Sequence, residues 1–252
     1  MLAERRRALI LEALARHGSV MVTDLHRRLK VSRETIRRDI QRLDADNKLR
    51  KTHGGALAPD AVEPAVAERM RINIDGKRAI ARAAAELVPD GAALIVDCGT
   101  TSLCLAEVLV ARRRLVVYTN DIQVAERLAG RNDNRVYLLG GEIAGNQGAT
   151  FGRDATAMLG GYFADLAFVS PAVVSNHPWL MDYTREAAAL HETMIANARA
   201  VILLVDSTKF GRTAPARVAN FERAQTLIVD KNPPQGQLRA LKTIAGKIVV
   251  AK

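Results

Sequence analysis

From about residue 76 onward, short apolar segments alternate with amphipathic segments, and this alternation restricts the fold more than any other feature of the chain. The apolar segments that we expect to form strands are residues 93–97, 115–119, 135–139, 165–170, 201–206 and 226–230. Amphipathic segments with helical spacing lie at residues 76–87, 101–109, 121–129, 153–161 and 184–198. Strands that are apolar on both faces are buried on both faces. The pattern therefore predicts an α/β domain over residues 76–252, with helices on both faces of a Rossmann-like parallel sheet.

Residues 1–58 follow a different pattern, which predicts three helices and a hairpin. Apolar residues at helical spacing indicate a first helix, and Thr23 is expected as the N-cap of a short second helix. Ser32 is expected to cap a third helix that runs to about Asp46. Short extended segments around Gly54-Gly55 predict a hairpin. Two helices joined by a short turn and followed by a hairpin are typical of a winged helix-turn-helix.

Residues 59–75 are predicted as a linker between these two parts. The segment contains Pro59, Pro64 and mixed charge, and a short helix is expected at 64–71. The sequence shows neither an internal repeat nor a low-complexity tract. The 252 residues are therefore predicted to form a small N-terminal domain, a linker and a larger C-terminal domain.

The positive charge of the chain is concentrated in its N-terminal part. The formal net charge is +10. Residues 1–58 hold 14 Lys and Arg against 7 Asp and Glu, whereas residues 59–252 hold 23 against 20. Most of the excess charge thus sits in less than a quarter of the chain. Such asymmetry indicates an anionic partner for the N-terminal domain, and a uniformly basic enzyme would not show it.

Cysteine usage and hydropathy favour a soluble, cytoplasmic protein. Cys98 and Cys104 form no CxxC motif and no Cys/His cluster with zinc spacing, so we interpret them as reduced, buried thiols. The N-terminus lacks the apolar region of a signal peptide. The longest apolar runs are far shorter than the ~18 residues of a membrane span. We expect no metal, no cofactor and no membrane partner.

The segment SRETIRRD, residues 32–39, places three arginines on the predicted third helix. If Ile36 and Ile40 face the core, the arginines fall largely outside the buried face. Arg reads guanine bidentately or clamps phosphate, so double-stranded operator DNA is the expected partner. The expected contacts are Thr23, Ser32, Arg33, Thr35, Arg37, Arg38, Arg42, Arg50, Lys51 and His53. The alternative is a solvated basic face, but the preceding helix, the short turn and the basic hairpin argue against it.

The stretch VMVTDLHRRLKVSRETIRRDIQRLDADNKLRKTHGGA resembles the signature of the DeoR family of bacterial transcriptional regulators. VSRETIRRDIQRL followed by the HGGA turn carries most of this resemblance. The resemblance implies that residues 20–39 form the helix-turn-helix and that residues 32–46 enter the major groove.

A second candidate site lies where DCGTTS leads from a predicted strand into a helix. A glycine turn, hydroxyl groups and the free N–H groups of a helix start form a site for phosphate. Ligands of open α/β sheets bind at the carboxyl ends of strands, where Lys209 can neutralise a phosphate and Asp97 or Asp206 can accept from sugar hydroxyls. The other expected contacts at these strand ends are Gly99, Thr100, Thr101, Ser102, Thr119, Asn120, Gly140, Gly141 and Glu142. Two alternatives stay open: GTTS as a helix cap only, and Gly140-Gly141 as a turn only.

Several blocks of the C-terminal part resemble the DeoR C-terminal sensor domain, namely DCGTTS, YTNDIQVAERL, LLGGEI, FGRDA and VDSTKFGR. The resemblance thus covers residues 3–234. It implies a fold similar to ribose-5-phosphate isomerase and CoA-transferase subunits, and a phosphorylated sugar or polyol as effector. The effector contacts that it implies are Asp97, Gly99, Thr100, Thr101, Asn120, Gly141 and Lys209.

The chain departs from the family pattern after the fourth predicted strand. A Gly-Ala-x-Gly type block is replaced there by Ser170-Pro171-Ala172-Val173, whose bulkier side chains change the expected pocket wall. LMDYTREA and FGRDAT resemble the glycerol-3-phosphate regulon repressors more than deoxyribonucleoside or fructose-pathway regulators. Asp182, Tyr183 and Glu186 are accordingly expected to border the effector.

The expected function is that of a repressor of a carbohydrate or polyol catabolic operon, and not that of an enzyme. A single winged helix makes few DNA contacts, so we expect a homo-oligomer, at least a dimer, assembled through the C-terminal domain. The resemblance implies that the effector relieves repression. The alternative is a sugar-phosphate isomerase with an appended DNA-binding domain. Asp97, Asp206 and Lys209 are suitable residue types for that reaction, but a fold does not imply an activity.

Overall fold

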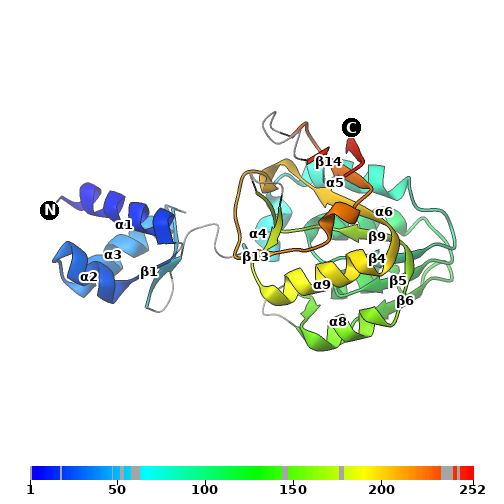
Figure 1. Ribbon diagram of the computed structural model, residues 1–252, viewed down its shortest axis with the longest axis horizontal. Helices are drawn as coiled ribbons and strands as arrows, with labels where there is room; N and C mark the ends of the chain where they lie inside the picture. Colours follow the sequence, from blue (N-terminus) through cyan, green and yellow to red (C-terminus); the bar gives the residue numbers. More distant parts are fainter. Residues whose placement is uncertain are drawn as a thin grey trace. The chain divides into compact units, whose positions relative to one another are not determined.

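The computed structural model describes residues 2–17, 19–46, 48–51, 54–57, 63–143, 147–175, 179–233, 241–242 and 245–252. The chain separates into two compact units, Met1–Glu63 and Pro64–Lys252 (Figure 1). The predicted boundaries at residues 58 and 75 stay a prediction. Residues 64–75 carry the short helix α4 (Val66–Arg71) and the start of α5 (Ile74–Ala85), and they belong to the second unit.

The first unit is a winged helix-turn-helix, as the sequence predicts. Its elements are α1 (Ala3–His17), β1 (Ser19–Met21), α2 (Val22–Leu29), α3 (Arg33–Ala45), β2 (Arg50–Lys51) and β3 (Gly55–Leu57). The three strands form an antiparallel sheet in the order β1-β3-β2. The core between the helices and this sheet is built from the apolar side chains of Ile10, Leu14, Leu25, Ile36, Ile40, Leu43 and Leu49.

The structure corrects the predicted start of the second helix. Thr23 is not an N-cap, because it lies inside α2, which begins at Val22, and Met21 precedes the helix without a side-chain cap. Strand β1, which the sequence reading missed, explains the shift. Met21 pairs with Gly55 in β3, and the N–H of Val22 donates to the carbonyl of Gly54, so the chain turns directly from strand into helix.

The second unit is built on a seven-stranded sheet in which every neighbouring pair is parallel. The strand order is β15-β14-β12-β9-β4-β5-β6. Six of these strands match the predicted apolar segments: β4 (Ala93–Val96), β5 (Val116–Thr119), β6 (Arg135–Leu138), β9 (Ala164–Val169), β12 (Ala198–Val205) and β14 (Thr226–Val229). The seventh strand, β15 (Lys247–Val250), was not predicted.

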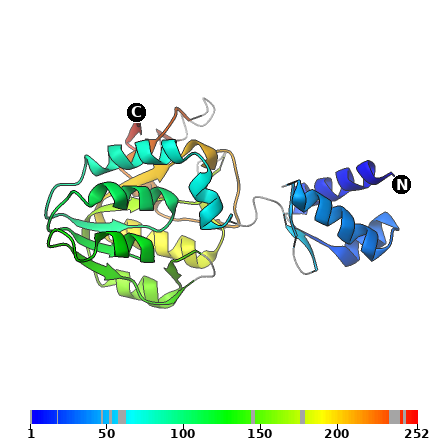
Figure 2. The same ribbon diagram turned by 180° about the vertical axis from the view of Figure 1, so that it is seen from behind.

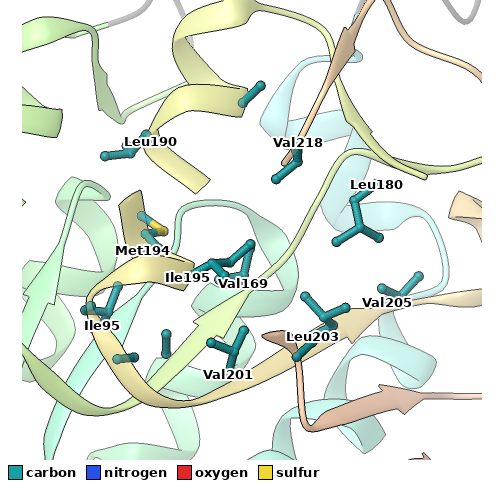
Figure 3. Packing of buried hydrophobic residues seen from close by; sticks show 14 of the residues in the cluster. Ile95, Val169, Leu180, Leu190, Met194, Ile195, Val201, Leu203, Val205 and Val218 are labelled. Atoms are coloured by element: carbon teal, nitrogen blue, oxygen red, sulfur yellow. The ribbon is translucent and has the colours of Figure 1, made fainter. Parts of the chain in front are cut away.

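Helices cover both faces of this sheet (Figures 1 and 2). On one face, α5, α6 (Thr100–Leu109) and α7 (Ile122–Leu128) pack on the strands. On the other face lie α8 (Arg153–Gly160) and α9 (Arg185–Ala196). Figure 3 shows side chains of α9 packed over the strands on this second face, among them Leu190, Met194 and Ile195 over Ile95, Val169, Val201 and Leu203.

The second unit also contains two small antiparallel sheets. One is the pair β7 (Glu142–Ile143) and β8 (Thr150–Phe151). The other, which we call the small sheet, has the order β10 (Val173–Val174), β11 (Leu180–Asp182) and β13 (Ala216–Arg217). The 3-10 turns η2 (Ser207–Lys209) and η3 (Phe221–Arg223) complete the described elements. No helix in the part of the chain described above has the length and apolarity to cross a membrane.

Candidate nucleic-acid interface and effector site

The recognition helix α3 presents its arginines to solvent. Arg33, Arg37 and Arg38 are exposed, whereas Ile36 and Ile40 are buried in the core of the first unit. Glu34 lies 3.8 Å from both Arg37 and Arg38, and these exposed pairs hold the guanidinium groups only weakly. The basic face of α3 is therefore available to an anionic partner.

The start of α3 is capped as predicted. Ser32 is the N-cap, and its hydroxyl oxygen accepts from the backbone N–H of Thr35 at 3.1 Å. The hydroxyl groups of Ser32 and Thr35 also lie 2.8 Å apart. Both side chains sit at the positive end of the helix, where a DNA phosphate would be stabilised.

A partly buried ion pair links α3 to α1. Asp39 is buried and accepts from the guanidinium of Arg6, with Nη2 at 3.1 Å from Oδ1 and Nε in a second contact. This hydrogen bond with Asp39 raises the pKa of Arg6. Asp39 thus serves to orient the helix, although it lies within the arginine-rich segment.

The remaining expected DNA contacts are spread over the rest of the first unit. Thr23 is exposed in the first turn of α2, and Arg42 is exposed on α3, with its Nε 3.5 Å from Asp46. Arg50 and Lys51 form β2, and the N–H of Lys51 donates to Asp44 at 2.9 Å. His53 lies outside the described residues. The basic hairpin therefore adjoins the C-terminal half of α3.

In the second unit, the motif DCGTTS turns from β4 into α6. Gly99 has a φ of +105°, which glycine adopts without strain, and Thr100 is the first residue of the helix. Thr101 and Ser102 are buried, and their hydroxyl oxygens find no hydrogen-bond partner among the described residues. Buried hydroxyl groups without a partner are costly. They fit a site whose polar groups are completed by a ligand.

Three cations that act on one another, Lys209, Lys77 and Arg69, lie in this part of the second unit, and Arg69 lies beside the turn. Lys209 lies in η2, directly after β12, and its Nζ contacts the hydroxyl of Ser170 at 3.0 Å and the carbonyl of Pro171 at 2.7 Å. Lys77 of α5 is buried and donates to the carbonyl of Arg69 at 2.5 Å. Arg69 lies beside Gly99, because a Cβ atom added to that glycine would be 3.6 Å from Nη1 of Arg69. Lys209 thus contacts Ser170 and Pro171, the first two residues of the block that departs from the family pattern.

The pKa shifts show that these charges act on one another. Burial lowers the pKa of Lys77, the cations Lys209 and Arg69 lower it further, and Asp206 opposes them. Burial alone would raise the pKa of Asp206, but Lys209, Thr208 and Lys77 together hold it below its ordinary value. The site is therefore rich in positive charge, with one ionised carboxylate inside it.

Sequence reasoning missed Lys77 and Arg69. It placed Lys77 on an amphipathic helix and Arg69 in a linker, and nothing in the local pattern distinguishes them from surface residues. Their position depends on Asn73, which lies between α4 and α5. Its side-chain N–H donates to Asp230 at 2.9 Å and lies 3.4–3.5 Å from Ser207 and Asp206. Asn73 therefore ties the segment before α5 to the ends of β12 and β14.

The end of β5 supports the GTTS turn. Thr119 and Asn120 are fully buried, and Asp121 caps α7. The Oδ2 atom of Asp121 accepts from the N–H of Gly99 at 3.1 Å, a contact that was not predicted. Burial raises the pKa of Asp121 although three backbone N–H groups lower it. The side chain of Asn120 donates to the carbonyl of Thr150, which leaves its amide oxygen without a described partner.

Gly141 and Glu142, which were expected at the site after β6, lie beside β8. Gly140, Gly141 and Glu142 are exposed, and Gly141 has a φ of +129° beside the carbonyl of Phe151. Glu186 is also exposed, in the first turn of α9. There it lines a surface pocket of about 450 Å³ together with Gly152, Arg153, Thr156, Ala157, Arg185 and Ala189. No described contact joins these residues to Lys209 or to the GTTS turn.

Asp97 and Asp182, both expected as effector contacts, are buried and lie on either side of His191. Nδ1 of His191 lies 2.7 Å from Oδ2 of Asp182, and Nε2 lies 2.8 Å from Oδ2 of Asp97. The second contact is poorly aligned for a hydrogen bond, so we treat it as an ion pair. Burial alone would lower the pKa of His191, but the two carboxylates raise it well above its ordinary value. The two carboxylates therefore favour the charged form of the imidazole.

A winged helix-turn-helix with an arginine-rich recognition helix, joined to an α/β unit with a cationic site at its strand ends, defines a ligand-sensing DNA-binding regulator. Comparison with known families agrees with this class. Residues 6–62 match the DeoR-like helix-turn-helix domain, and residues 72–231 match the DeoR C-terminal sensor domain. The chain belongs to the DeoR family of transcriptional regulators, and the sequence prediction is confirmed.

Individual relatives are named as repressors. The chain is 29% identical to the glycerol-3-phosphate regulon repressor of Escherichia coli (strain K12), over 92% of each chain. It is 31% identical to the HTH-type transcriptional repressor GlcR of Bacillus subtilis (strain 168), over 93% of this chain and 91% of the relative. Among solved structures, ribose 5-phosphate isomerase A from Methanocaldococcus jannaschii matches with a TM-score of 0.40 and 20% identity, over 55% of each chain.

Proposed function

We propose that this regulator represses a carbohydrate or polyol catabolic operon and releases its operator when a phosphorylated sugar or polyol binds the second unit. The cluster of Lys77, Lys209 and Arg69 around the GTTS turn carries the effector half of the proposal. Helix N-termini with adjacent cations bind phosphate. The unpartnered hydroxyls of Thr101 and Ser102 supply hydrogen-bonding groups at the same turn.

The residues that we propose as effector contacts form two groups. Gly99, Thr100, Thr101, Ser102, Lys209, Lys77 and Arg69 surround the phosphate. Asp206 lies in the same cluster of charges and is proposed to accept from a hydroxyl group of the effector. Thr119, Asn120 and Asp121 are proposed to hold the GTTS turn in place without touching the effector. Gly140, Gly141, Glu142 and Glu186 are left without a proposed contact.

DNA binding is proposed to use the exposed arginines of α3 and the basic hairpin. Arg33, Arg37 and Arg38 are proposed to enter the major groove, with Ser32 and Thr35 at a phosphate. Arg50 and Lys51 are proposed to contact the backbone. Because one such unit makes few contacts, we also propose a homo-oligomer, at least a dimer, that presents two recognition helices to paired half-sites.

We further propose that the chain is not an enzyme. An isomerase needs a base positioned at the substrate. Of the two carboxylates suited to that role, Asp97 lies against His191, and Oδ1 of Asp206 accepts from the N–H and the hydroxyl of Thr208. Incubation with ribose 5-phosphate and detection of ribulose 5-phosphate tests this point. Turnover that is lost in Lys209→Ala would contradict it.

Fluorescence anisotropy tests the proposed function. Labelled DNA from upstream of the chain's own gene is titrated at fixed physiological salt, with and without sugar and polyol phosphates, glycerol 3-phosphate included. We expect one phosphate compound, and not its unphosphorylated form, to weaken binding. Lys209→Ala is expected to keep DNA binding and lose the response. Tight DNA binding that no phosphate changes would contradict the effector half alone.

A further inference from the structure

His191 is a buried charged group that neither the DNA-binding surface nor the proposed effector contacts use. It projects from α9 between the end of β4 and the small sheet, with Asp97 on one side and Asp182 on the other. All three side chains are more than nine-tenths buried. Burying a charge without partners is costly, so such a group is retained where its partners compensate for it.

Asp97 connects His191 to both halves of the proposed phosphate site. Its Oδ1 accepts from the N–H of Cys98 at 2.7 Å, directly before the Gly99 turn. Its Oδ2 accepts from the N–H of Ser170 at 2.8 Å, in the turn that receives Nζ of Lys209. One carboxylate therefore holds the backbone of the GTTS turn and the backbone that docks Lys209.

Asp182 anchors the other side of the imidazole to the small sheet. It lies on β11, where its backbone pairs with Ala216 of β13. The neighbouring strand β10 bridges the Lys209 segment, because Val174 pairs with Phe210 and its carbonyl accepts from Gly211. The position of His191 is thus set by the same sheet that holds the segment after Lys209.

We infer that His191 is a positioning residue for the effector site. As an imidazolium it fixes the carboxylate of Asp97, and Asp97 in turn fixes the Cys98–Gly99 and Ser170–Pro171 backbones between which a phosphate and Lys209 meet. Asp97 and Asp182 therefore act through the backbone and the imidazole rather than by touching the effector. This inference refines the proposed effector site and rests on it for its function.

The other charged side chains on the described elements around His191 either contact other groups or are exposed. Glu192 of α9 accepts from the N–H of Ala219, Arg217 of β13 lies 3.6 Å over the ring of Trp179, and Lys209 contacts Ser170. Arg153 and Asp154 of α8, and Arg185 and Glu186 of α9, are exposed. The charges that act on the imidazole are those of Asp97 and Asp182.

Hydrogen exchange of the full chain tests the inference without any effector. In His191→Gln, backbone amides of residues 97–102 and 168–172 are expected to exchange faster than in the wild type, while the rest of the second unit keeps its protection. A merely structural role would raise exchange throughout the unit. Glu192→Gln, on the next residue of α9, is the matched control and should leave both segments unchanged. Unchanged or uniformly faster exchange in His191→Gln would overturn the inference.

Phosphate binding supplies the functional readout. With inorganic phosphate and glycerol 3-phosphate as probes, His191→Gln is expected to bind about tenfold more weakly, the scale of losing a supporting residue behind a binding site. Operator affinity without effector should not change. Equal affinity of variant and wild type for a probe that the wild type binds would contradict the inference. A wild type that binds neither probe would count against the proposed phosphate effector, and the exchange data would still decide on His191.

A second variant keeps the test decisive if His191→Gln does not fold. Asp182→Asn preserves shape and removes the anchor on the small sheet, and it should give the same local pattern of exchange. The ¹⁵N shifts of the wild-type imidazole are expected to show a charged ring well above pH 6.5, the reference value of a free histidine. A ring that titrates at that value would overturn the inference.

Discussion

Arg37 and Arg38 lie on the exposed face of α3, each 3.8 Å from the exposed carboxylate of Glu34. We predict that Arg37→Ala or Arg38→Ala weakens operator binding by about 1–3 kcal/mol if the lost contact reads a base. Anisotropy titrations over a range of salt concentrations measure the loss. Arg131→Ala, an exposed arginine of the second unit, is the charge-matched control. Wild-type affinity and salt slope in both α3 variants would contradict the groove assignment.

His191 makes a pH-dependent contribution to the stability of the second unit. Its pKa in the folded chain lies well above 6.5, whereas the unfolded imidazole titrates near that value. Its contribution is therefore complete below pH 6.5 and is lost as pH rises through the folded-state pKa. We predict that denaturant titrations show the wild type losing stability above pH 6.5 relative to His191→Gln. Parallel pH profiles of the two proteins would rule out the contribution.

At the scale of single residues, the sequence predicts exposed groups better than buried ones. The arginines of α3 follow from a 100° turn per residue once Ile36 and Ile40 are assigned to the core. Lys77 and His191 do not, because each sits on a helix whose pattern gives no sign of burial. Their roles arise from partners far along the chain, such as Asp206 for Lys77 and Asp97 for His191.

Among the elements, the three-stranded sheet of the first unit, which forms the wing, depends on a close approach between β1 and β3. A Cβ at Gly55 would lie 1.9 Å from the carbonyl oxygen of Val20, a backbone atom that cannot move without opening the sheet. We predict that Gly55→Ala destabilises the first unit by about 1–3 kcal/mol, as overpacking does, and weakens DNA binding. Thermal denaturation measures the change.

Gly54 is the matched control for this prediction. A Cβ there meets only the end of the flexible Met21 side chain, at 3.3 Å. Gly54→Ala should therefore change stability by less than about 0.5 kcal/mol. If the two variants were equally stable, the steric argument for the wing would fail.

The long elements of the second unit were predictable and the short ones were not. Strands such as β4 and β9 are continuous apolar runs, and their alternation with helices determines a covered parallel sheet. Strands β10, β11 and β13 have two or three residues each, too few for any period to appear. The sequence therefore could not predict the small sheet that carries Asp182, and it could not predict that Asp182 is buried.

For the whole molecule, the two units have cores that share no residue. The buried cluster of the first unit runs from Ile10 to Ala56, and the clusters of the second unit begin at Ile80. We predict two calorimetric transitions, because each core can be lost without the other. Added alone, operator DNA should stabilise only the first unit, and an effector phosphate added alone should stabilise only the second, each by about 2.7 kcal/mol at 100 times Kd. A single transition that both ligands shift would contradict this independence.

The strand order of the large sheet also determines when each unit can complete its folding. Every pairing in the first unit joins residues within the first 57 positions, whereas β4 at Ala93–Val96 pairs with β9 at Ala164–Val169 on one side. Contacts between distant residues slow folding, and domains fold as they emerge during synthesis. The proposed DNA-binding surface is therefore complete on the nascent chain before the sheet that carries the proposed effector site can form.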